Sequence, residues 1–65
     1  MTQTRTLREP VPEQIRQARE SAGLTQAEAG ALIGAPLRSW QDWEYGRRNM
    51  PIAKWELWQI RASGP

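Results

Sequence analysis

The sequence predicts an all-α fold, a compact four-helix domain. Apolar residues recur at intervals of three and four, and no segment shows the strict alternation that is typical of a strand. Glycine and proline divide the chain into four segments of helical length. A chain of 65 residues has room for one small core. We therefore expect a domain over residues 12–62, preceded by a flexible arm over residues 1–11 and followed by a polar tail over residues 63–65.

The first two helices are predicted from the residues at their ends. The first helix covers residues 12–22, because proline suits a first helical turn and Gly23 can end the helix. The second helix begins at Thr25, where the sequence TQAE forms a capping box with Glu28 as its third residue. Gly34 ends this helix after about eight or nine residues.

The third and fourth helices each follow a proline. The third is expected from Pro36 to about Tyr45, where Gly46 stops it. The fourth begins at Pro51 and has the sequence PIAKWELWQIRA. Both contain the pattern Trp-x-x-Trp, which places each tryptophan pair on one face of its helix.

The composition narrows the classes of function. The chain has no Cys and no His, so we expect no disulfide and no metal site, and no other cofactor is indicated. No apolar run is long enough to span a membrane and the N-terminus lacks an apolar secretory segment, so we expect a cytoplasmic protein. Scattered carboxylates and the lack of a glycine-rich phosphate loop argue against an enzyme. Eight of the nine basic residues are Arg, which suits contacts to phosphate and guanine, although GC-rich coding would produce the same bias.

The stretch RSWQDWEYGRRNMP, residues 38–51, combines bulky apolar side chains with hydrogen-bonding ones. On a helix, Trp40 and Trp43 share one face and are expected to anchor it to the core. Four residues lie mostly on the other face: Leu37, Arg38, Gln41 and Asp42. That face is either an ordinary solvated surface, with Arg38 and Asp42 as an exposed ion pair, or a surface that contacts base edges.

The preceding segment favours the second interpretation. A short helix, a turn that contains glycine and another helix are the parts of a helix-turn-helix. Gly30 lies within the first of these helices and costs about 1 kcal/mol of helix propensity relative to Ala. Close contact with the next helix would explain that cost.

The segment AGLTQAEAGALIGAPLRSWQDWEYGRR carries the landmarks of a known family: Leu24, Thr25, Gln26, Gly30, Gly34, Trp40, Trp43, Glu44 and Gly46. With these landmarks, residues 15–60 resemble the helix-turn-helix of the Cro/CI-type (Xre) phage repressors, which have the lambda-repressor-like fold. Within that family, RSWQDWEYGRRNMP is most similar to short regulators that are associated with phage anti-CRISPR operons and repress their own promoters.

The resemblance implies roles for individual residues. Gln26 would hydrogen-bond a DNA phosphate at the N-terminus of its helix. Base contacts would come from four residues of the third helix: Leu37, Arg38, Gln41 and Asp42. The arginine suits guanine and the glutamine suits adenine, while the aspartate would accept from cytosine or orient the arginine. Arg47 and Arg48 would contact phosphates or reach toward the minor groove, with a solvated loop as the alternative.

The resemblance also implies a structural ion pair. Arg19 and Glu44 match a family pair that forms a partly buried salt bridge between the first and third helices. The chain departs from the family pattern at Pro36, where most members have a Ser or Thr that caps the recognition helix. It also shows no fifth helix, which builds the dimer in many members.

The fourth helix carries two apolar stripes on roughly opposite sides. One consists of Ala53, Leu57 and Ile60, and the other of Trp55, Trp58 and Ala62. We expect one stripe to cover the core, and the tryptophan stripe to form the interface of a homodimer. The alternative is that the N-terminal arm folds back over this helix.

The sequence thus predicts a transcriptional repressor that binds double-stranded DNA sequence-specifically. It would be autoregulatory, encoded by a phage or mobile element, and bind an inverted repeat as a homodimer without cofactor or metal. A protein-binding adaptor on the same scaffold, such as an antitoxin, is the main alternative, and RNA binding is a third.

Overall fold

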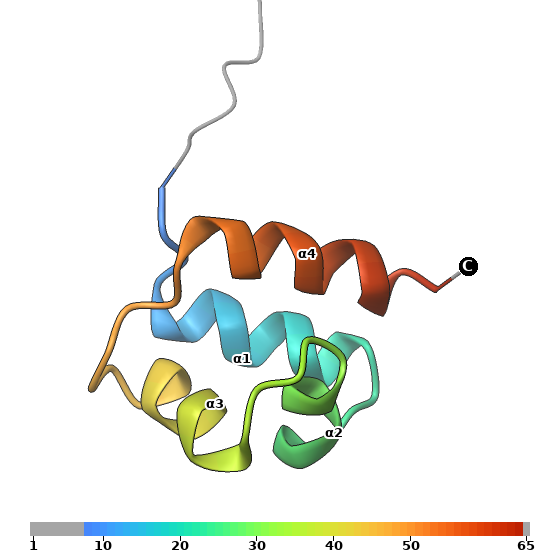
Figure 1. The fold of residues 1–65 in the computed structure, drawn as a ribbon, viewed down its shortest axis with the longest axis horizontal. Coiled ribbons are helices and arrows are strands. Elements are labelled where there is room, and N and C mark those ends of the chain that lie inside the picture. Colours follow the sequence, from blue (N-terminus) through green and yellow to red (C-terminus); the bar gives the residue numbers. More distant parts are fainter. Residues whose placement is uncertain (1–7, 65) are drawn as a thin grey trace, which may run out of the picture.

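The computed structural model describes residues 8–64, so expectations for residues 1–7 and 65 lie outside the described residues. Four helices follow one another, and this part of the chain contains no strand: α1 (Pro12–Ser21), α2 (Gln26–Ala31), α3 (Leu37–Glu44) and α4 (Ile52–Ala62). The all-α prediction is confirmed. In Figure 1, α4 lies along one side of the domain with α1 beside it, and α2 and α3 form the other side. No helix within the described range has the length and hydropathy needed to cross a bilayer.

The start of α2 follows the predicted capping box, but its end differs from the prediction. Thr25 Oγ1 accepts from the Glu28 N–H at 3.0 Å, and Glu28 Oε1 accepts from the Thr25 N–H at 2.9 Å. The helix has only six residues. Beyond it, the N–H groups of residues 32–34 each donate to the carbonyl three residues earlier, which tightens the chain into a turn. Gly34 closes this turn with a φ of 70°, a conformation that favours glycine.

The face that α4 turns toward the core differs from the expected one. Trp58 is only 2% exposed and its indole N–H donates to the Ala29 carbonyl at 3.0 Å. Trp55 and Ala62 are half-buried against the same core, whereas Ile60, on the other stripe, is 68% exposed. The expected dimer surface of Trp55, Trp58 and Ala62 is therefore the inner face of α4. Indoles bury more apolar area than the competing stripe, and the Trp58 N–H finds an acceptor there.

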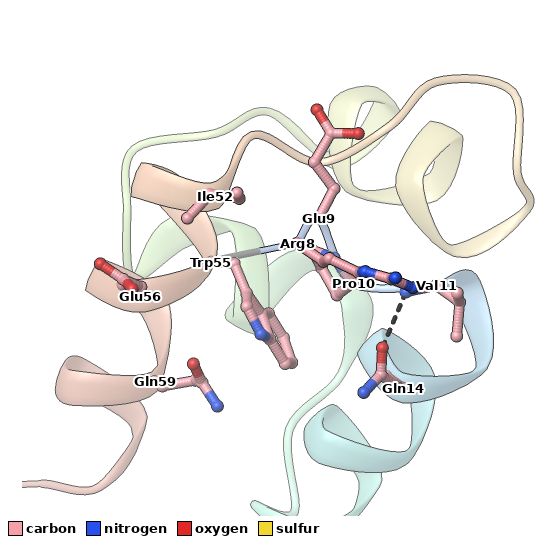
Figure 2. Close-up of a pocket in the computed structure, with 9 residues that line it drawn as sticks. All are labelled: Arg8, Glu9, Pro10, Val11, Gln14, Ile52, Trp55, Glu56 and Gln59. Carbon is pink, nitrogen blue, oxygen red and sulfur yellow. Dashed lines mark hydrogen bonds between the residues drawn. The ribbon is translucent and has the colours of Figure 1, made fainter. Parts of the chain in front are cut away.

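Residues just before α1 lie against α4. Pro10 is buried, and the Val11 N–H donates to Gln14 Oε1 at 2.9 Å at the start of α1. Together with α4, this segment lines a pocket of about 400 Å³, with the Trp55 indole on its wall (Figure 2). Residues 8–11 of the predicted arm thus lie beside α4, and the alternative in which the whole arm folds back over this helix stays a prediction, because residues 1–7 lie outside the described residues.

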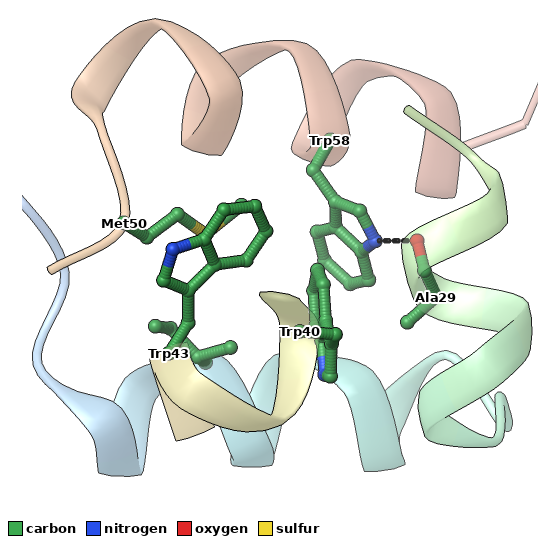
Figure 3. Close-up of a cluster of buried hydrophobic side chains, with 6 residues drawn as sticks. Ala29, Trp40, Trp43, Met50 and Trp58 are labelled. Atoms are coloured by element: carbon green, nitrogen blue, oxygen red, sulfur yellow. Dashed lines mark hydrogen bonds between the residues drawn. The ribbon is translucent and has the colours of Figure 1, made fainter. Parts of the chain in front are cut away.

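The core is built mainly from indoles (Figure 3). Six buried side chains form it: Ile15, Ala29, Trp40, Trp43, Met50 and Trp58. Trp40 meets Trp43 edge-on, with ring centroids 5.9 Å apart, and packs on Trp58 at 5.4 Å. Trp55 stacks in parallel on Trp58 at 5.8 Å. Because these four rings come from α3 and α4 alone, they fix the two helices relative to each other.

The turn between α2 and α3 explains why residue 30 is glycine. A Cβ on Gly30 would lie 2.6 Å from the carbonyl oxygen of Ala35, and the Gly30 carbonyl accepts the Ala35 N–H at 2.9 Å. The sequence suggested contact with the next helix. The structure instead shows that the backbone of the connecting turn is what excludes a side chain.

Replacing Gly30 with Ala should destabilise the domain even though Ala is the better helix former. Forcing backbone apart typically costs about 1–3 kcal/mol, more than the roughly 1 kcal/mol gained in helix propensity. Ala31→Gly, at an exposed position of the same helix, measures the propensity effect alone. A thermal melt in which Gly30→Ala equals or exceeds the wild type would contradict this account.

Candidate nucleic-acid interface

The polar side of α3 faces outward because its other side is held in the core. Trp40 and Trp43 are buried, whereas Leu37 and Arg38 are exposed near the start of the helix. Pro36 precedes them in an extended conformation and makes no side-chain cap. The first turn of α3 therefore presents one apolar and one cationic side chain to solvent, as a helix that enters a DNA groove requires.

The side chains of Gln26 and Gln41 are joined. Gln41 Nε2 donates to Gln26 Oε1 at 3.3 Å, which links α3 to the N-terminus of α2. Gln26 Nε2 donates to Glu44 Oε1 at 3.1 Å and to the Tyr45 hydroxyl at 3.2 Å. Both N–H donors of Gln26 are thus used within the protein. The expected contact of Gln26 with a phosphate would require its hydrogen bond to Tyr45 to be exchanged.

Asp42 pairs with the turn after α3 and not with Arg38. Its carboxylate lies 3.1 Å from Arg47 Nη1 and 3.5 Å from Arg48 Nε. No ion pair joins Arg38 to Asp42 in the described part of the chain. The expected orientation of Arg38 by Asp42 is therefore absent from these side-chain contacts, and a base contact by Asp42 stays a prediction, since each of its oxygens can accept a further hydrogen bond.

Tyr45 belongs to this surface although the sequence interpretation assigned it no role. It is exposed, its hydroxyl accepts from Gln26, and the Arg47 guanidinium lies 5.3 Å from the centre of its ring. The spacing contained the signal, because Tyr45 is four residues after Gln41 and seven after Arg38 and so shares their helical face.

The carboxylate of Glu44 joins three helices beneath this surface. Arg19 of α1 donates from Nε to Oε2 at 2.5 Å and from Nη2 to Oε1 at 3.3 Å. Trp40 Nε1 donates to Oε2 at 2.5 Å, and Gln26 supplies the fourth hydrogen bond. The Glu44 side chain is 1% exposed and that of Arg19 is 15% exposed. The structure thus contains the ion pair that the family resemblance implied.

The hydrogen bonds to Glu44 determine its ionisation. Burial alone would raise its pKa, but the hydrogen bonds from Arg19, Trp40 and Gln26 and the charge of Arg19 lower the pKa below 4.5. The pKa of Arg19 is raised, first by its hydrogen bond to Glu44 and then by the charge of that carboxylate. Both groups are therefore charged at neutral pH, and each compensates the other's loss of water.

Comparison with known proteins agrees with this geometry. A family model described as "Helix-turn-helix domain" matches residues 13–60, which include α2, α3 and most of α1 and α4. The chain belongs to the helix-turn-helix domain family. No curated protein gives a significant match. In this chain α2 and α3 are the two helices of the motif, and the family is one of DNA-binding regulators, in which the second helix of such a motif is the one that enters the major groove.

Truncation of Glu44 to Ala should largely unfold the helix-turn-helix domain. Removing one partner of a buried pair typically costs about 3–5 kcal/mol, because the other charge stays buried without compensation. A thermal melt followed by circular dichroism measures the loss. Glu13→Ala breaks an exposed pair with Arg16 and should change the melting temperature far less. If Glu44→Ala melts within about a degree of the wild type, the structural role of the pair is wrong.

The domain should lose stability at acid pH through Glu44. Since its folded pKa is depressed, its contribution is fully present above the ordinary value of 4.5 and is lost as the pH falls through the folded pKa. Urea denaturation between about pH 7 and pH 3 should show a steeper loss of unfolding free energy in the wild type than in Glu44→Gln. Parallel curves would contradict the assignment.

Proposed function

We propose that the protein is a sequence-specific transcriptional repressor that places α3 in the major groove of double-stranded DNA. The observation that carries this proposal is the division of α3 into two faces. Trp40 and Trp43 anchor one face, while Leu37, Arg38 and Gln41 project from a helix that is rigidly held. A helix of this kind fits the width of the major groove and can reach base edges from it.

The residues divide into base and backbone contacts. Arg38 is suited to guanine, whose O6 and N7 match a forked guanidinium, and Gln41 is suited to adenine. Gln41 would read its base while held by Gln26, which limits the positions its amide can take. Arg47 and Arg48 lie exposed in the turn after α3 and would contact phosphates.

We also propose that two copies bind an inverted repeat with half-sites about one turn, roughly 10 bp, apart. The surface that joins them is not the outer face of α4. That face lies on the side of the domain away from α3 (Figure 1), so a pair formed through it would point its two recognition helices in opposite directions. A symmetric complex needs contacts on a flank of the domain, or is assembled on the DNA itself.

The proposed mechanism is occupancy of a promoter, which excludes polymerase without any catalysis. Autoregulation and a phage or mobile-element origin are part of the proposal. They are supported by the similarity of RSWQDWEYGRRNMP to regulators of that kind. The cytoplasm is the expected compartment for such a regulator.

An adaptor that binds a protein is the second candidate. Leu57 and Ile60 project from α4 away from the core, and an exposed apolar pair of this kind can contact a partner. Both functions could use different faces of the same domain. Binding to DNA discriminates between them: an adaptor would show no sequence preference.

Selection from a random DNA pool should recover one preferred sequence with two-fold symmetry. Arg38→Ala should then relax the preference at one base pair in each half-site, at a cost of about 1–3 kcal/mol. Recovery of a pool without any preferred sequence would overturn the proposed function.

Arg47→Ala should weaken binding to all sequences alike, because a phosphate contact carries no base information. The slope of log affinity against log salt should become shallower by about 0.9 for each phosphate contact removed. Lys54→Ala is the matched control, since it also removes one exposed cation but belongs to α4, the helix on the side of the domain away from α3 (Figure 1). Equal slopes for the two variants would contradict the placement of Arg47 at the DNA.

A further inference from the structure

Asp42 holds the two arginines of the turn after α3. Its Oδ1 is 3.1 Å from Arg47 Nη1 and its Oδ2 is 3.5 Å from Arg48 Nε. Its backbone carbonyl accepts the N–H groups of both arginines, at 2.9 Å and 3.2 Å. One residue therefore fixes both the path of the turn and the direction of its two cations.

Further contacts restrict the two guanidinium groups. Arg48 Nη2 donates to Ser39 Oγ at 3.3 Å, and the Arg47 guanidinium lies over the Tyr45 ring. The arginine side chains are nevertheless 63% and 57% exposed, whereas that of Asp42 is 16% exposed. Each guanidinium has five N–H donors, so donors remain for a second acceptor without loss of the first.

Exposed arginines attract the phosphates of any DNA, whatever its base sequence. The carboxylate of Asp42 opposes this attraction, because it competes for the same N–H groups and repels phosphate. The opposition is smallest when the arginines can reach phosphates while they keep their bonds to Asp42. If the specific complex meets that condition and the varied arrangements of nonspecific binding do not, Asp42 favours the specific complex over the others.

We propose that Asp42 is a specificity-determining residue that holds Arg47 and Arg48 in the geometry of the specific complex and weakens their binding to other DNA. The inference rests on the proposed function, since it requires a preferred DNA sequence. It assigns Asp42 a positioning role in place of a base contact.

The test compares the wild type with Asp42→Asn on the selected operator and on a random-sequence duplex of equal length at low salt. Asp42→Asn should bind random DNA about three- to five-fold more tightly, as expected from loss of a partly exposed ion pair at the upper end of its usual strength. Its affinity for the operator should stay within about two-fold of the wild type or fall, so the ratio of the two affinities drops. The sequence recovered by selection should be unchanged.

Glu56→Gln is the matched control, because it makes the same change in charge on α4. It should leave the affinity ratio at the wild-type value. Thermal melts establish whether each variant is folded. If Asp42→Asn does not fold, Asp42→Ser replaces it in the same comparison.

Three results would contradict the inference or the proposed function, and they can be told apart. A ratio for Asp42→Asn equal to that of Glu56→Gln overturns the inference. A changed preference at one base pair also overturns it and makes Asp42 a base contact. A wild type with no preferred sequence overturns the proposed function itself.

Discussion

The buried carboxylate of Glu44 is the interaction on which the arrangement of the helices depends. A charge that is almost fully removed from water must be matched by donors, and these donors come from three helices: Arg19 of α1, Gln26 of α2 and Trp40 of α3. Arg19 also donates to the Leu24 carbonyl at 2.9 Å, which ties the α1–α2 connection to the same point. This small chain has few apolar residues to bury, so the hydrogen bonds of the Glu44 carboxylate help to fix the relative positions of α1, α2 and α3.

The hydrogen bonds around Glu44 also connect to the candidate interface. Gln26 is hydrogen-bonded to the buried Glu44 and also to Gln41 and Tyr45 of the candidate interface. The proposed DNA surface is therefore connected to the interior by hydrogen bonds. Asp42 orders the neighbouring turn in the same way. Side chains that are already fixed lose less freedom when they bind, so the interface is prepared for its ligand before contact.

Local features of the structure were predictable from the sequence, whereas contacts between side chains and groups far apart in the sequence were not. The four helices, the capping box at Thr25 and the inward direction of Trp40 depend on neighbours within a few residues, and short spacings reveal them. The inner face of α4 depends on the Ala29 carbonyl, which lies 29 residues before Trp58 and is absent from any local pattern. Gln26 likewise has partners, Glu44 and Gln41, that only the folded chain brings near.

The connected indoles have a spectroscopic consequence. All tryptophans of the chain belong to one group, in which Trp40, Trp43 and Trp58 are shielded from water and Trp55 stacks on it. None of them lies on the outward side of α3. Intrinsic fluorescence therefore reports mainly on the interior, and a shift in emission when DNA binds at α3 would reveal a rearrangement of the core, not quenching at the contact surface.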